Sequence, residues 1–172
     1  MEPQMVRLKQ MIRAALSVAL MLVFLSIFRG ITNILNAFLV PMTVYFTSSR
    51  MNTREITAFF LLTLIMTGLF HNIQIPFMML YLLMAFLLKE MNQRRFSMIL
   101  KIGGLTTVAG LGFYVSIRMT DYFFLTRMNY IFIKMFDGRS SLYALMLLLE
   151  GFLISLALIV GSARMDQRIK SI

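Results

Sequence analysis

The sequence is poor in charged side chains and contains no cysteine. Only 14% of its 172 residues are Asp, Glu, Lys or Arg, whereas 59% are hydrophobic. A soluble domain carries about 25% charged and about 45–50% apolar residues, so this chain lacks the polar side chains that would cover a water-facing surface. Without cysteine, it forms no disulfide and offers no thiolate to a metal or a substrate.

Signatures of enzymes and metal sites are missing as well. The sequence has no glycine-rich phosphate loop, no G-x-S-x-G and no H-E-x-x-H. One histidine without cysteine is too little for a conventional transition-metal site. We therefore expect no enzyme, no catalytic residue, no metal and no cofactor.

What the sequence does contain is long runs without a charge. They cover residues 14–28, 30–49, 56–88, 102–117 and 140–163, the last with Glu150 inside it. A helix needs roughly 20 mostly apolar residues to cross a hydrocarbon core about 30 Å thick. The runs are continuous rather than alternating, and lipid tolerates only helices or closed barrels, so they predict helices. The expected fold is all-α: a polytopic integral membrane helical bundle.

The runs divide into six transmembrane helices in one domain that covers residues 1–172. The 33-residue run at 56–88 is too long for one crossing, and His71-Asn72-Ile73-Gln74-Ile75-Pro76 supplies a polar break followed by proline. Asn52 three residues before Glu55 predicts a capping box at the start of the third helix. The expected helices are about 11–28, 31–48, 55–70, 75–89, 96–118 and 141–162, of which the short fourth helix is tilted or begins inside the membrane.

Segment 119–136 has two interpretations. Its apolar residues are interrupted by charges, which is typical of a helix lying in the membrane interface rather than across the bilayer. The alternative is a seventh span. Gly138 is expected to stop this segment. The first run follows a basic stretch, as in a signal peptide, but no small-residue cleavage site follows Phe28, so we expect it to be retained as the first span.

The distribution of basic residues predicts the orientation. Lys and Arg concentrate on the cytoplasmic side of membrane proteins, and 12 of the 17 lie on one side if both termini are cytoplasmic. The four positive charges of the loop between helices five and six lie on the other side. The basic residues that give the net charge of +10 thus lie between the apolar runs, where they can contact anionic headgroups. The sequence lacks a basic block interleaved with aromatics, the pattern that would indicate nucleic-acid binding. The expected location is the cell membrane, with lipid as a partner.

Small residues mark helix faces that pack closely in lipid. The fifth and sixth helices carry several, and these are expected to hold the bundle together. They are Gly103, Gly104, Ala109, Gly110 and Gly112 on the fifth helix and Gly151, Ser155, Ala157 and Gly161 on the sixth.

Ala15 and Ala19, near the cytoplasmic end of the first helix, resemble the Ala-x-x-x-Ala signature of the S components of energy-coupling-factor (ECF) transporters. The chain length, six spans and outer loop between helices five and six are also similar to that family. The resemblance implies a vitamin or similar micronutrient as small-molecule substrate, captured from outside. It implies that Ala15 and Ala19 contact a transmembrane coupling subunit driven by separate ATPase subunits.

A second resemblance points to a different class. The run Leu39-Val40-Pro41-Met42-Thr43-Val44-Tyr45 is similar to YybS-like bacterial membrane proteins, and the size and hydropathy are similar to the cell-shape protein MreD. This implies a scaffold or assembly factor of the bacterial envelope. The alanine pair would then hold a different helical partner.

Glu150 is the first candidate for contact with a substrate. A carboxylate near the middle of an apolar run costs several kcal/mol unless it is paired, hydrated or protonated. It either contacts a ligand or an ion in a pocket, or it pairs with a neighbouring cation or hydroxyl. In both cases it is expected to face the bundle.

The remaining candidates lie at the outer ends of the helices. His71, Asn72 and Gln74 either bind a polar ligand or only break one span into two. Asn33, beside Arg29, either lines a pocket or caps the second helix. A final group combines aromatic and charged side chains at the outer end of the fifth helix and in the following loop. It forms either a lid over a small molecule or an aromatic belt in the membrane interface. Its members are Tyr114, Arg118, Asp121, Tyr122, Arg127 and Tyr130.

Overall fold

The structure is a computed structural model, and it describes residues 2–28, 33–49 and 51–170. Every regular element in these ranges is helical, as expected for the all-α class. The elements are α1 (Glu2–Ile27), α2 (Asn33–Ser48), α3 (Thr53–Phe70), the short 3-10 helix η2 (Asn72–Gln74), α4 (Ile75–Gln93), α5 (Met98–Phe124), α6 (Met128–Met135) and α7 (Ser140–Lys170).

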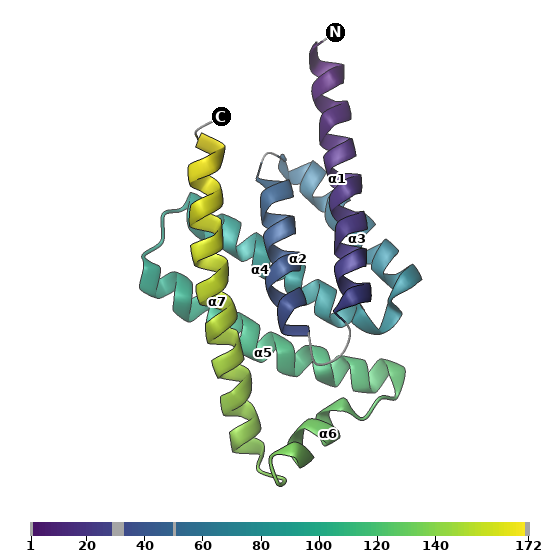
Figure 1. Cartoon of the computed structure of the whole chain (residues 1–172), viewed down its shortest axis with the longest axis vertical. Helices are drawn as coiled ribbons and strands as arrows, with labels where there is room; N and C mark the ends of the chain where they lie inside the picture. Colours follow the sequence, from purple (N-terminus) through teal and green to yellow (C-terminus); the bar gives the residue numbers. More distant parts are fainter. Residues whose placement is uncertain (1, 29–32, 50, 171–172) are drawn as a thin grey trace.

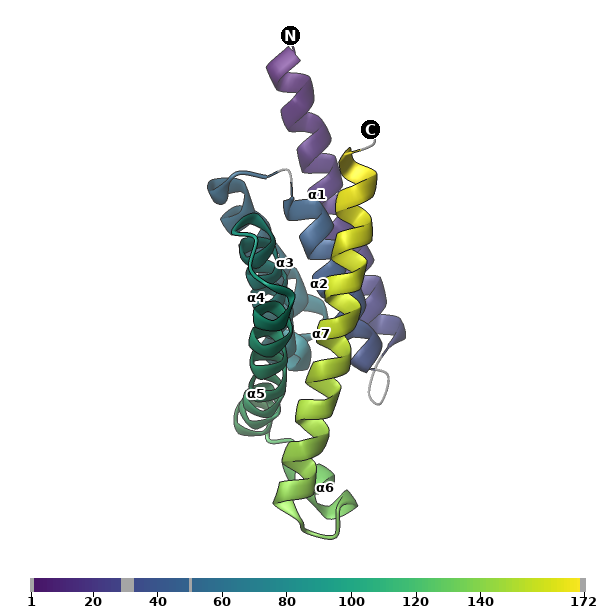
Figure 2. The ribbon, with the colours of Figure 1, turned by 90° about the vertical axis from the view of Figure 1, so that its left-hand side faces the viewer.

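The long helices form two layers (Figure 1, Figure 2). In one layer α2 packs between α1 and α7, and in the other α4 packs between α3 and α5. The layers face each other through three pairs of helices: α1 with α3, α2 with α4, and α7 with α5. The start of α1 and the end of α7 lie at the same end of the molecule, which we call the terminal end, and α6 lies at the opposite end (Figure 1).

The helix α4 is the centre of the bundle. Within the described ranges, five helical stretches are long and apolar enough to cross a membrane. In the stretch that contains α4, 56% of the residues are buried, whereas in the other four only 17–28% are buried. Met78, Tyr81, Met84, Ala85 and Leu88 are fully inaccessible to solvent. The expected end at residue 89 is wrong, because the helix continues through four further polar or sulfur-containing residues to Gln93.

Five helices in the described part of the chain are long and apolar enough to cross a membrane. They are Leu8–Ile27, Thr53–Phe70, Asn72–Gln93, Met98–Phe124 and Ser140–Gln167. Their outward faces carry large apolar side chains such as Leu61, Leu111 and Leu145, which suit a lipid surface. The apolar part of α2, Ile34–Ser48, is shorter. At 1.5 Å per residue it is about 22 Å long, less than the thickness of a typical hydrocarbon core.

Two local signals in the sequence are confirmed. Glu55 N donates to Asn52 Oδ1 at 3.0 Å and Asn52 N donates to Glu55 Oε2 at 2.9 Å, which completes the capping box at the start of α3. The long apolar run breaks where expected: α3 ends at Phe70, and α4 begins at Ile75 with Pro76 in its first turn. Proline suits this position because the first amides of a helix have no partner within it.

The segment at 119–136 is divided between the end of α5 and the short helix α6, and its position in the membrane interface stays a prediction. The expected end of the fifth helix at residue 118 is wrong, because α5 continues to Phe124 and ends at Leu125 in the left-handed conformation (φ +52°). Only eight residues, Met128–Met135, form α6. At about 12 Å this helix is too short for a seventh span. As expected, the helix stops before Gly138, whose φ is +77°.

Several of the glycines of α5 and α7 pack closely against other helices, whereas Ala157 of α7 is exposed. A Cβ on Gly104 would meet the Met91 side chain, one on Gly112 the Leu80 side chain, and one on Gly161 the Met42 side chain. Gly103 is different, because nothing lies within 4 Å of its Cβ position.

Candidate functional site

The two alanines of α1 lie on a face that the bundle leaves exposed. Ala15 and Ala19 are both exposed, and Met11 (70%) and Leu16 (68%) are exposed beside them. The opposite face of α1 is buried, with Met21 and Leu25 in the core. The alanine pair is therefore available to a partner and contributes nothing to the core of this chain.

Glu150 lies on α7 beside the place where α7 crosses α5. It is half-buried, and it lies within electrostatic range of Tyr81 and Tyr143. Among the described residues, the carboxylate has no hydrogen-bond or ion-pair partner. The structural alternative, a pair with a neighbouring cation or hydroxyl, thus has no support from the geometry of these residues.

The aromatic and charged group at the end of α5 contains a pair and a cap. Arg118 Nε donates to Tyr114 Oη at 3.2 Å, and its guanidinium lies 5.5 Å from the Tyr114 ring centroid. Asp121 accepts hydrogen bonds from the backbone N of Met128 at 2.8 Å and of Asn129 at 2.9 Å. Its carboxylate therefore caps the first turn of α6, a position that favours negative charge.

The other members of this group are exposed. Tyr122 is 78% exposed and its ring stacks edge-on against Phe123, and the exposed Arg127 precedes α6. A shallow hollow of about 520 Å³ beside Arg118 and Tyr122 is bordered only by α5. Among the described residues, no second helix lines this hollow as a lid.

Buried aromatic packing joins α6 to α7 near this group. Tyr143 is only 2% exposed and stacks on Phe132 of α6, with ring centroids 6.0 Å apart and planes at 9°. Tyr143 also lies within electrostatic range of Tyr114, Arg118 and Glu150. Tyr143 thus interacts electrostatically with candidates from both α5 and α7.

The turn between α3 and α4 lies beside the end of α1. Ser26 Oγ and His71 Nε2 are 3.0 Å apart and form a hydrogen bond. Asn72 is exposed, and its Oδ1 accepts from the backbone N of Ile73. The buried Oε1 of Gln74 has no hydrogen-bond partner within residues 2–28, 33–49 and 51–170. The side chain of Asn33 lies outside the described part of the chain, although the residue begins α2.

A polar cluster at the terminal end was missed in the sequence. Tyr45 Oη donates to the Asp166 carboxylate at 2.9 and 3.0 Å, and it accepts from Asn92 Nδ2 at 2.9 Å. Lys101 Nζ donates to Asn92 Oδ1 at 2.7 Å, and Asn92 Nδ2 also lies 3.3 Å from Ser162 Oγ. This cluster joins α2, α4, α5 and α7. No local pattern in the sequence predicts this cluster, because Tyr45 and Asp166 are 121 positions apart.

Lys89 also has a role that the sequence did not predict. It is one of the 12 basic residues that the orientation places on the cytoplasmic side, and its side chain is buried (9% exposed). Its Nζ donates to the carbonyl oxygen of Ser48 at 2.7 Å and approaches that of Met51 at 3.5 Å. A cation at this place satisfies the last carbonyls of α2 and interacts favourably with the helix dipole.

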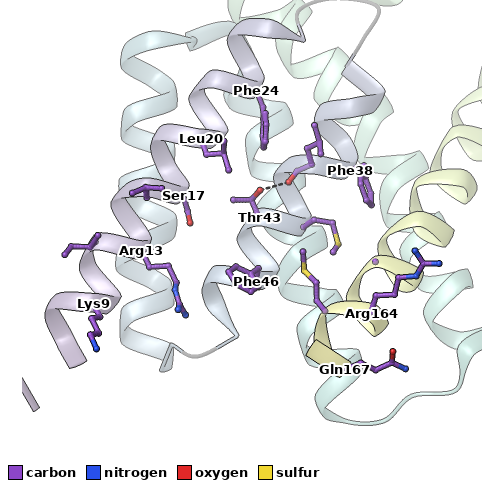
Figure 3. A pocket seen from close by; sticks show the side chains of 16 residues that line it. Lys9, Arg13, Ser17, Leu20, Phe24, Phe38, Thr43, Phe46, Arg164 and Gln167 are labelled. Atoms are coloured by element: carbon purple, nitrogen blue, oxygen red, sulfur yellow. Dashed lines mark hydrogen bonds between the residues drawn. The ribbon is translucent and has the colours of Figure 1, made fainter. Parts of the chain in front are cut away.

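A second hollow contains none of the predicted substrate-binding residues. It is a groove of about 1220 Å³ between α1 and α7 with α2 as its floor. Toward the terminal end, Lys9 and Arg13 lie on its α1 side and Arg164 on its α7 side, whereas Phe24 and Phe38 lie farther from that end (Figure 3).

In the described part of the chain no three His, Cys, Asp or Glu residues form a group that could hold a metal ion. Comparison with protein-family models, curated proteins and solved structures finds no match to this chain. The fold and site therefore define a class: a helical membrane protein with an uncovered alanine face and a half-buried carboxylate.

Proposed function

We propose that this chain is the membrane-embedded substrate-capture subunit of a micronutrient uptake transporter, similar to an S component and energised by partner ATPases. In this proposal six helices, including the shorter α2, cross the cell membrane, and both termini are cytoplasmic. The position of the chain ends at one end of the bundle supports an even number of crossings (Figure 1). The vitamin-like substrate arrives at the opposite end, where α6 lies.

The observation that carries the proposal is the exposure of Ala15 and Ala19 on one face of α1. Small residues four apart let two helix backbones approach closely in lipid. Within this chain the pair is not used for that purpose, since the other helices pack against the opposite face, around Met21 and Leu25. A helix from a coupling subunit is the partner that the resemblance implies for this face.

The proposed substrate contacts centre on Glu150. An ionisable group within an apolar helix is functional by default, and Glu150 has no partner among the described residues. Tyr114 and Arg118 lie near the same buried tyrosine, Tyr143, and supply hydroxyl and guanidinium donors. The substrate itself would complete the pocket, by drawing these side chains together.

Co-purification tests the proposal. The tagged wild-type chain is expected to carry a coupling subunit and two ATPases through purification, and Ala19→Trp is expected to lose all three. The matched control is Ile65→Trp on α3, where the side chain is also exposed (59%) but lies away from the alanine face. Loss of the complex in both variants, or its retention in both, would overturn the assignment of this face.

The alternative class is a YybS-like or MreD-like scaffold of the bacterial envelope. The same alanine face supports it, because such a protein also requires a helical partner. The same purification distinguishes the two classes. A stable complex with cell-wall or division proteins, without ATPases and without a bound small molecule, would favour the scaffold.

A further inference from the structure

The groove between α1 and α7 exists because these two helices both pack on α2 and make at most slight contact with each other. Its volume of about 1220 Å³ exceeds the roughly 300–1,000 Å³ of pockets for small ligands. Leu20 and Phe24 of α1 and Phe38 of α2 form apolar walls (Figure 3). Such walls suit a long hydrocarbon chain rather than a compact polar solute.

One end of the groove is basic. Lys9, Arg13 and Arg164 line it together with the amide of Gln167, and no Asp or Glu is among its lining residues. The Arg13 guanidinium lies 5.6 Å from the centroid of the Phe46 ring, a cation–π contact that holds it against the groove. A guanidinium binds phosphate through paired hydrogen bonds.

The depth of these cations matches a lipid headgroup. Lys9 is at the start of the apolar stretch Leu8–Ile27 of α1, and Arg164 is close to the end of the stretch Ser140–Gln167 of α7. Both therefore lie where the two helices leave the hydrocarbon region, and the apolar walls lie at the level of the acyl chains. Basic residues at this level attract anionic lipids.

A second copy of this chain fits the groove poorly. The chain has a net charge of +10 and only seven acidic residues, so it offers little to neutralise three cations. An anionic phospholipid supplies both the negative charge and the hydrocarbon.

We propose that the groove between α1 and α7 binds one anionic glycerophospholipid. Its headgroup lies between Lys9 and Arg13 on the α1 side and Arg164 on the α7 side, and an acyl chain lies along Leu20, Phe24 and Phe38. The lipid fills the space between two helices that the protein does not pack together, and so becomes part of the bundle. Ala15 and Ala19 do not line the groove, although Leu16 beside them does.

Native mass spectrometry of the purified full-length chain tests this proposal. The chain is reconstituted with equal amounts of phosphatidylglycerol and phosphatidylcholine and then released from the membrane mimetic. The wild type is expected to retain one phosphatidylglycerol in preference to phosphatidylcholine. A basic residue at the membrane surface contributes about five-fold to affinity, so Arg13→Gln with Arg164→Gln is expected to reduce the preference about 25-fold.

Two further variants separate the charge from the fold. Lys134→Gln with Arg139→Gln removes two exposed cations at the opposite end and is expected to leave retention unchanged. Leu20→Trp keeps every charge but fills the groove, and it is expected to lose the bound lipid. Equal retention of both lipids by the wild type, or undiminished phosphatidylglycerol on Arg13→Gln/Arg164→Gln or on Leu20→Trp, would overturn the proposal. So would a protein partner found cross-linked in the groove in place of lipid.

Discussion

Gly110 of α5 and Gly151 of α7 meet where the two layers cross. A Cβ placed on Gly151 would lie 2.9 Å from the backbone N of Gly110 and 2.9 Å from the carbonyl oxygen of Thr106. These are backbone atoms, which cannot move away without moving α5. The close approach of the two helices therefore requires glycine at position 151, as small residues do generally between helices in lipid.

Gly151→Val is expected to destabilise the bundle by about 1–3 kcal/mol, the usual cost of overpacking a filled core. Unfolding in mixed micelles measures the change in free energy. Gly103→Ala is the control, since nothing lies within 4 Å of that Cβ position, and alanine there is expected to stabilise the helix by roughly 0.5–1 kcal/mol. A Gly151→Val protein as stable as the wild type would show that the layers separate more easily than this contact implies.

The contact between Tyr45 and Asp166 leads to a second prediction. Tyr45→Phe removes one hydroxyl that donates to Asp166 and accepts from Asn92. A hydrogen bond to a charged group contributes about 1.5–3 kcal/mol, and we expect a loss of that size in the free energy of unfolding. Tyr130→Phe, at an exposed position of α6 (63%), is the control. A double-mutant cycle with Asp166→Ala that gives no coupling energy would contradict the prediction.

Asp121 leads to a third prediction, about α6. Asp121→Ala removes the acceptor for the amides of Met128 and Asn129, and the loss of a helix cap costs about 0.5–2 kcal/mol. Hydrogen exchange at these two amides is expected to become several-fold faster, while exchange in the buried α4 stays unchanged. Asp137→Asn is the control: it removes the same charge, and asparagine tolerates the left-handed conformation found there (φ +53°). Equal acceleration in both variants would assign the effect to charge alone.

The features that the sequence predicted are those encoded by neighbouring residues. The capping box needs only Asn52 and Glu55, and the break before α4 needs only the polar turn and Pro76, so each is visible within a few positions. The apolar runs likewise located the helices. Because hydropathy marks the part of a helix that suits lipid, it did not show that α5 continues beyond Arg118 or that α1 begins at Glu2.

The features that were missed depend on packing between distant segments. No pattern around Lys89 indicates that its ammonium reaches the carbonyl of Ser48, 41 positions earlier. The burial of α4 was missed for the same reason, since its sequence is no more apolar than that of its neighbours. The candidate site stays a prediction. The sequence indicated Glu150, Tyr114 and Arg118 but gave no indication of Tyr143, which interacts electrostatically with all three.

Glu150 gives the last prediction, which separates a functional carboxylate from a structural one. The side chain is half-buried in a helix that is apolar enough to cross a membrane, and it has no partner among the described residues. Such a group opposes folding unless a ligand compensates for it. We therefore expect Glu150→Gln to raise the thermal midpoint of the ligand-free protein in detergent and to reduce the amount of co-purifying small molecule found by mass spectrometry. Residues that are needed for function often lower the stability of the folded protein.

Glu90→Gln serves as the control, because Glu90 forms only an exposed pair with Arg94, which contributes about 0–1 kcal/mol. If Glu150→Gln instead lowered the midpoint, the carboxylate would be a structural group, and the substrate contacts would have to be sought among His71, Gln74 and the start of α2.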